Sequence, residues 1–140
     1  MRKAIVLAAA VALVCASTAL AGGWATVKLS SKPTGVAAGE PWIVDITVLQ
    51  HGLATQPLCC VKPTLTIRRV ASARTTSSSL KEPQARTFRA KPTNRTGVYR
   101  ARVLFPGAGM WRYEVYDAFT AYGGARTHRF KAVRIAPSGT

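Results

Sequence analysis

Acidic side chains are the scarcest class of charge in this 140-residue sequence. Asp and Glu together number 5, against 20 Lys and Arg, and the formal net charge at pH 7 is +15. This balance favours contact with anions such as nucleic acid, acidic polymers or phospholipid headgroups. The positive residues are scattered, and their nearest approach to a cluster is the set Arg86, Arg89, Lys91 and Arg95.

Cysteine is also rare, with 3 residues in the whole chain. Cys15 belongs to the N-terminal segment, and Cys59 and Cys60 are direct neighbours, which cannot close a long-range loop. A disulfide framework is therefore excluded. A hydrophobic core must hold the fold, and the chain is long enough to build one domain around such a core.

Long apolar runs are absent except at the N-terminus. Arg2 and Lys3 precede an unbroken apolar run over 4–14, and Ala19-Leu20-Ala21 is a small-x-small cleavage signal. This order is typical of a secretory signal peptide. The run is about half of the roughly 20 residues that a membrane span requires. We therefore predict that residues 1–21 are cleaved and that residues 22–140 form a secreted, extracytoplasmic domain without a transmembrane span.

Helical periodicity is absent beyond that run, whereas short alternating segments recur between turn residues. The expected strands are 24–30, 42–49, 63–70, 84–90, 98–105, 110–117 and 127–135. Their spacing predicts an all-β fold, a single immunoglobulin-like β-sandwich of about seven antiparallel strands. Within the last strand the inward-facing set changes parity near Lys131 and Ala132, which predicts a β-bulge.

The clearest alternation lies in 98–117, where two strands flank the turn 106–109. Both strands place aromatic and β-branched residues on one face, so we expect them to pair as a hairpin. We expect Trp42 and Trp111 to be the central packing residues of the core.

Residues 97–115, with the sequence GVYRARVLFPGAGMWRYEV, resemble the C-terminal half of YtkA-like and FixH-like bacterial envelope domains. The stretch 39–48 is similar to the opening of the same domains. The resemblance implies a small immunoglobulin-like domain of the cell envelope, secreted or tethered to a membrane. FixH-like members are associated with copper transport and oxidase assembly, so the resemblance also implies a link to copper.

Soft metal ligands are few: Cys59, Cys60, His51, His128 and Met110. Thiolate, thioether and imidazole groups suit Cu(I), and the loop after the second strand holds His51 and both thiols. Adjacent cysteines do not match a zinc spacing, and they can equally form a vicinal disulfide, pair with another chain or remain reduced. We expect no cofactor, with a copper ion bound by Cys59, Cys60 and His51 as the alternative.

Catalytic motifs are missing. The sequence has no close pair of carboxylates for acid–base work, no nucleophile elbow and no helix to carry a phosphate-binding loop. Glu114 is expected to form an ion pair with Arg112 or Arg102. We therefore expect that the protein is not an enzyme.

Most aromatic residues alternate inward; the exceptions are Tyr116, Phe119 and Tyr122, near Arg126 and Arg129. These five residues predict a patch for a partner, with the alternative that Phe119 folds back to cap the core. Nucleic-acid binding is disfavoured because it would need aromatics on an open sheet face. The sequence thus predicts a non-catalytic binding or accessory domain that contacts an envelope protein, an anionic polymer or phospholipid. Copper handling through the Cys59-Cys60 loop is the alternative function.

Overall fold

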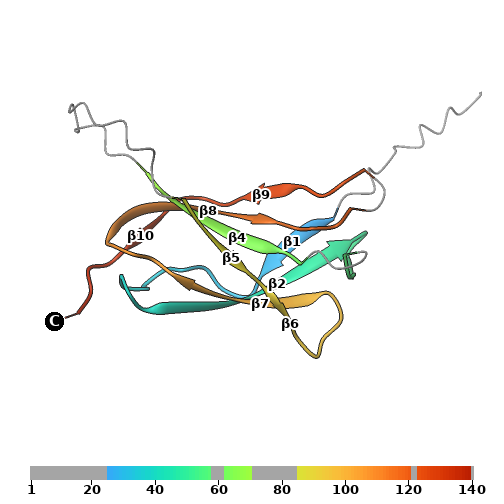
Figure 1. Cartoon of the computed structure of the whole chain (residues 1–140), viewed down its shortest axis with the longest axis horizontal. Helices are drawn as coiled ribbons and strands as arrows, with labels where there is room; N and C mark the ends of the chain where they lie inside the picture. Colours follow the sequence, from blue (N-terminus) through green and yellow to red (C-terminus); the bar gives the residue numbers. More distant parts are fainter. Residues whose placement is uncertain (1–24, 58–61, 71–84, 121–122, 140) are drawn as a thin grey trace, which may run out of the picture.

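The computed structural model describes residues 25–57, 62–70, 85–120 and 123–139, and these ranges form two antiparallel sheets that face each other (Figure 1). This arrangement confirms the prediction of an all-β sandwich. The described part of the chain contains no helix long and apolar enough to cross a membrane. The predicted signal peptide, 1–21, lies outside the described residues.

Each sheet has five strands. The first sheet contains β1 (Thr26–Leu29), β2 (Pro41–Gln50), β3 (Leu53–Ala54), β6 (Lys91–Pro92) and β7 (Val98–Leu104). The second contains β4 (Thr64–Arg69), β5 (Ala85–Arg89), β8 (Gly109–Tyr116), β9 (Thr127–Arg129) and β10 (Val133–Ile135). The strand orders are β1-β2-β7-β6, with β3 beside β2, and β10-β8-β4-β5, with β9 beside β8.

The core lies between the sheets and follows the alternation of the sequence. On β2 every second side chain from Trp42 to Val48 is buried, and β8 buries Trp111, Tyr113 and Val115 against them. Trp42 packs edge-on against Tyr113, with ring centroids 5.4 Å apart, and stacks on Phe105 at 6.3 Å. Trp42 and Trp111 are 4% and 1% exposed, which confirms their predicted place in the core.

The predicted hairpin over 98–117 is wrong, because β7 and β8 belong to different sheets. The turn carries the chain from one sheet to the other, so the apolar faces of both strands meet across the core instead of side by side. Phe105 and Trp111 contact each other edge-to-face at 5.7 Å, and the indole N–H of Trp111 donates to the carbonyl of Gly107 at 2.9 Å. Alternation cannot separate this connection from a hairpin, because both bury the same residues.

The predicted bulge near Lys131 is present. Arg129 of β9 lies opposite Glu114, whereas Val133 of β10 lies opposite Trp111. The three residues between Arg129 and Val133 therefore face only two residues of β8. This extra residue divides the expected strand 127–135 into β9 and β10, both paired with β8.

The two long flanks of the sandwich differ. On the bridged flank, next to β1 and β10, the backbone N–H of Ala38 donates to Ala136 O at 2.9 Å, and Ala136 N–H donates to Val36 O at 3.2 Å. On the open flank, β5 runs obliquely from the second sheet and continues through Ala90 into β6 of the first (Figure 1). The open flank therefore holds the edges of both sheets.

Candidate functional site

A groove of about 790 Å³ lies on the open flank. It is lined by residues of β5, β6 and β7, by the turn after β6 and by one side chain of β2. The cationic lining residues are Arg89, Lys91, Arg95, Arg100 and Arg102. Such a concentration of positive charge in a hollow raises the local concentration of anions.

The carboxylate of Asp45 forms ion pairs with two of these five cations. Arg100 donates to both carboxylate oxygens, at 2.7 and 3.0 Å, and Arg95 Nη2 donates at 2.9 Å. The hydrogen bond from Arg100 holds the pKa of Asp45 below its ordinary value, and the same contact raises the pKa of Arg100. The carboxylate therefore stays ionised at neutral pH.

The other three cations, Arg89, Lys91 and Arg102, form no ion pair with any residue that the structure describes. Each belongs to an exposed position of its strand. An external anion can therefore approach these side chains without displacing an internal partner.

The groove also has an apolar component. Ile43 is 55% exposed, although it lies in the middle of the sheet, and Phe88 and Pro92 line the same hollow. Arginine and lysine stems extend over such apolar surface while their charged ends remain in water. The groove can therefore contact a ligand that carries both negative charge and apolar groups.

Strand register explains how residues distant in sequence meet here. Ile43 lies opposite Arg102, and Asp45 lies opposite Arg100, which in turn faces Lys91. Because neighbours in register project to the same face, these side chains share the outer surface of the first sheet. The sequence cluster contributes Arg89, Lys91 and Arg95 to the groove lining, while Arg100 and Arg102 come from outside it.

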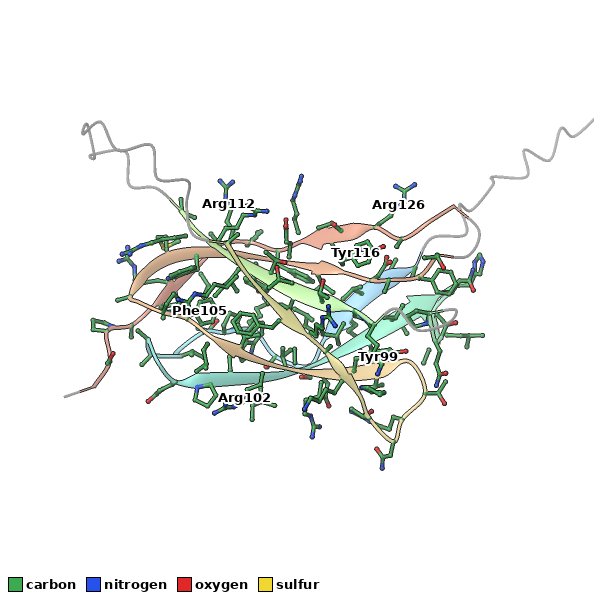
Figure 2. The ribbon with its side chains drawn as sticks, viewed as in Figure 1. Tyr99, Arg102, Phe105, Arg112, Tyr116 and Arg126 are labelled. Atoms are coloured by element: carbon green, nitrogen blue, oxygen red, sulfur yellow. The ribbon has the colours of Figure 1, made fainter. Side chains whose placement is uncertain are left out.

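The predicted partner patch is only partly assembled. Tyr116 is 36% exposed, and Arg126 is exposed near it, on the side of the molecule opposite Arg102 (Figure 2). Arg129 is exposed on β9, opposite Glu114. Phe119 is 3% exposed and belongs to the core, so it caps the sandwich and is not available to a partner. Tyr122 lies outside the described residues.

The expected partners of Glu114 are wrong. Its carboxylate pairs with Arg129 at 3.5 Å and with Arg68 at 3.8 Å, and not with Arg112 or Arg102. Arg129 lies directly opposite Glu114 on β9, and Arg68 comes from β4 on the other side. A directly opposite residue lies closer than a residue two positions along the same strand, which favours Arg129 over Arg112. Arg68 reaches Glu114 from a diagonal position on β4, and Arg102 belongs to the other sheet.

Sequence reasoning missed the role of Asp117, which is fully buried at the end of β8. Its Oδ1 accepts the backbone N–H groups of Phe119 at 2.9 Å and Arg126 at 3.1 Å, and Oδ2 lies 2.7 Å from Nε2 of His128. These bonds satisfy a carboxylate that would be costly to bury alone. The sequence did contain a sign of this burial, because Asp117 continues the alternation that places every second residue of β8 in the core.

The predicted metal ligands are dispersed or not described. Cys59 and Cys60 lie outside the described residues, whereas His51 is exposed in the turn between β2 and β3. His128 is held by Asp117, and Met110 lies on β8. Within the described ranges, no three His, Cys, Asp or Glu side chains gather as a metal site.

The likenesses of this chain to known proteins are weak. No family model matches the sequence, and no curated protein matches it. The chain is similar to two solved variants of superoxide reductase (neelaredoxin) from Ignicoccus hospitalis. The first has a TM-score of 0.42 at 14% identity, over 85% of this chain and 84% of that one. The second has a TM-score of 0.41 at 14% identity, over 86% of each chain. A likeness of this degree bears on neither activity nor ligand for this chain.

Proposed function

We propose that this protein is a non-catalytic binding domain whose groove on the open flank holds an anionic partner. The observation that carries the proposal is the group formed by Arg89, Lys91 and Arg102. These three cations line one hollow and have no ion-pair partner in the described part of the chain.

The chemistry of the groove suits carboxylate, sulfate or phosphate groups. A guanidinium presents a planar fork of donors that matches two oxygens of such an anion, and these charge-assisted bonds are stronger than neutral ones. Arg95 and Arg100 are already held by Asp45, which positions them and reduces their pull on a ligand. Binding should therefore depend mainly on the three unpaired cations.

We place this activity in the bacterial cell envelope. The support is the predicted signal peptide over 1–21 and the resemblance of residues 97–115 to envelope domains. Candidate partners there are an envelope protein with acidic segments, an anionic surface polymer or phospholipid.

The test is binding of dextran sulfate by the purified protein over a range of salt concentrations. The triple variant Arg89→Ser/Lys91→Ser/Arg102→Ser should bind at least about tenfold more weakly, a loss of roughly 1.4 kcal/mol or more. The matched control Arg112→Ser/Lys131→Ser/Arg134→Ser removes the same charge from exposed positions outside the groove. The control should lose less than about threefold, since screened charges outside the contact act weakly.

Equal losses in the two triple variants would contradict the proposal, because they would mean that net charge and not the groove governs binding. Both variants change only exposed side chains, so their melting temperatures should stay close to that of the original protein. Binding that is unchanged between low and high salt would exclude charge as the driving interaction.

Copper handling is a second candidate. Its support comes from the sequence, in which His51, exposed in the turn after β2, precedes the Cys59-Cys60 pair. Cu(I) would bind thiolate and imidazole groups. Metal analysis of the purified protein tests this candidate: near-stoichiometric copper that disappears in Cys59→Ser/Cys60→Ser would support it, and a metal-free protein after Cu(I) reconstitution would exclude it.

A further inference from the structure

The backbone of β5 offers hydrogen-bonding groups to the groove. Ala90 N–H donates to Pro63 O at 3.0 Å, in the same register that pairs β5 with β4. In an antiparallel ladder, bonded pairs alternate with pairs whose N–H and C=O point away from each other. Phe88 therefore bonds to β4, whereas Thr87 and Arg89 direct their N–H and C=O groups away from it. Thr87 and Arg89 also line the groove.

β7 has a second backbone edge that is free. Thr93 N–H donates to Val98 O at 3.0 Å, which makes Val98 and, by alternation, Arg100 and Arg102 the residues that point toward β6. The ladder between β6 and β7 extends only to Arg100. Arg102 has Ile43 of β2 beside it on one side. On the β6 side no strand of the described residues pairs with it, so its backbone N–H and C=O open toward the groove.

The positive charges on the edge of β5 determine which kind of strand can pair with it. β5 carries Arg86 and Arg89, and an antiparallel second copy of β5 would bring like charges together. Natural sheets use such charges to prevent edge-to-edge pairing, and like charges directly opposite each other destabilise a ladder. An incoming strand with acidic side chains would convert the repulsion into attraction. Its other face would meet the apolar groups of Phe88 and Pro92.

We propose that the partner of the groove is an extended polypeptide segment with alternating acidic and apolar residues, which adds to β5 as a further strand. This inference rests on the proposed anionic partner and specifies its class. In strand addition, main-chain hydrogen bonds provide affinity and alternate side chains provide specificity. A sulfated or phosphorylated polymer can use the cations of the groove but has no regular row of N–H donors for β5.

The probe is a capped heptapeptide of alternating Glu and Val, compared with two copies that are N-methylated either at every Glu or at every Val. A strand directs alternate N–H groups to opposite sides, so one methylated copy should bind at least tenfold more weakly than the parent peptide, although its charge is unchanged. Hydrogen exchange should show new protection of the Thr87 and Arg89 amides when the parent peptide binds.

A backbone variant of the protein tests the same contact. Thr87→Pro removes an N–H that points away from β4, so the ladder within the sheet is retained. It should lower the affinity for the parent peptide at least tenfold, a clearly larger factor than its effect on dextran sulfate binding. Thr87→Val is the matched control, because it keeps the N–H and loses only the side-chain hydrogen bond to Thr66. This control should bind the parent peptide at least about tenfold more tightly than Thr87→Pro does.

Two results separate failure of the inference from failure of the proposed function. If the parent peptide and both methylated copies bind equally, and the Thr87 and Arg89 amides gain no protection, strand addition is wrong even though the groove binds anions. If dextran sulfate and the peptide both bind without regard to Arg89, Lys91 and Arg102, the proposed function itself is wrong. The peptide arm uses the unaltered protein, so it decides the question even where Thr87→Pro does not fold.

Discussion

The bridged flank and the open flank join the same two sheets by different means. On the bridged flank, Ala136 exchanges backbone hydrogen bonds with Val36 and Ala38, and Phe130 stacks on Tyr113 with ring centroids 5.1 Å apart. On the open flank the chain crosses between the sheets at Ala90, and cations surround the groove beside it.

This difference suggests that the bridged flank contributes mainly to stability and the open flank mainly to ligand binding. Backbone hydrogen bonds on the bridged flank fasten the two sheets, and the packing of Phe130 on Tyr113 holds the bulge against β8. Changes there should therefore act mainly on the free energy of unfolding. On the open flank, Arg89, Lys91 and Arg102 form no ion pair within the described residues, so changes to them should act mainly on ligand affinity. Edges that carry charge also resist pairing with other copies of the same chain. The variants below test whether this separation holds.

The largest effect is expected from Trp111→Ala, which removes core contacts on which both flanks depend. Trp111 is 1% exposed, contacts Phe105 and bonds to the turn at Gly107. Loss of a buried Trp costs on the order of 3–5 kcal/mol, which is a large part of the stability of an ordinary domain. Urea unfolding measures the loss, with Arg112→Ala as a control on the exposed face of the same strand. A variant that melts within a degree or two of the original protein would show that the core is assigned wrongly.

A smaller effect is expected from Phe130→Ala on the bridged flank. The side chain is only partly buried but packs face-to-face on Tyr113. We expect a loss of about 1–2 kcal/mol in unfolding free energy, below the range for fully buried Phe. The folded variant should bind dextran sulfate with unchanged affinity. A fall in affinity comparable with that of the groove triple variant would break the separation between the flanks.

The strands and the core were predictable from sequence because alternation reports burial directly. The buried set of β2 and the inward parity of β8 both appear in the structure as expected, as does the bulge before β10. Which strands pair with each other was harder to predict from the sequence. The segments 98–104 and 109–116 bury the same faces whether they pair or oppose each other across the core, so alternation could not exclude the hairpin.

The groove was only partly predictable, because long-range register decides which charges meet. Arg89 and Lys91 are close in sequence to Arg95, but Arg102 joins them only through the pairing of β7 with β2 and β6. Asp117 shows a second limit of prediction from sequence. The alternation of β8 indicated that Asp117 faces the core, but the backbone N–H groups that stabilise its buried carboxylate are brought to it by the fold of the following loop.

The smallest and most specific effect is expected from Asp45→Asn, which changes the groove without removing a cation. The hydrogen bond from Arg100 lowers the pKa of Asp45, so the ionised form is favoured in the folded protein. A lowered carboxyl pKa contributes stability above the ordinary value of 3.8, and that contribution is lost as pH falls through the folded pKa. The original protein should therefore be slightly more stable than Asp45→Asn at pH 7, and the difference should vanish at lower pH.

Dextran sulfate affinity should change in the opposite direction. Asp45→Asn releases Arg95 and Arg100 from their ion pairs and leaves five cations around the groove without a carboxylate among them. Because sulfate groups stay ionised across this pH range, affinity at pH 7 should rise roughly twofold at low salt. Glu114→Gln is the matched control, since it releases Arg68 and Arg129 on the other sheet and should leave groove binding nearly unchanged. If Asp45→Asn weakened binding instead, Asp45 would serve chiefly to orient Arg95 and Arg100 toward the ligand, and the binding strength of the open flank would depend on positioned arginines more than on unpaired charge.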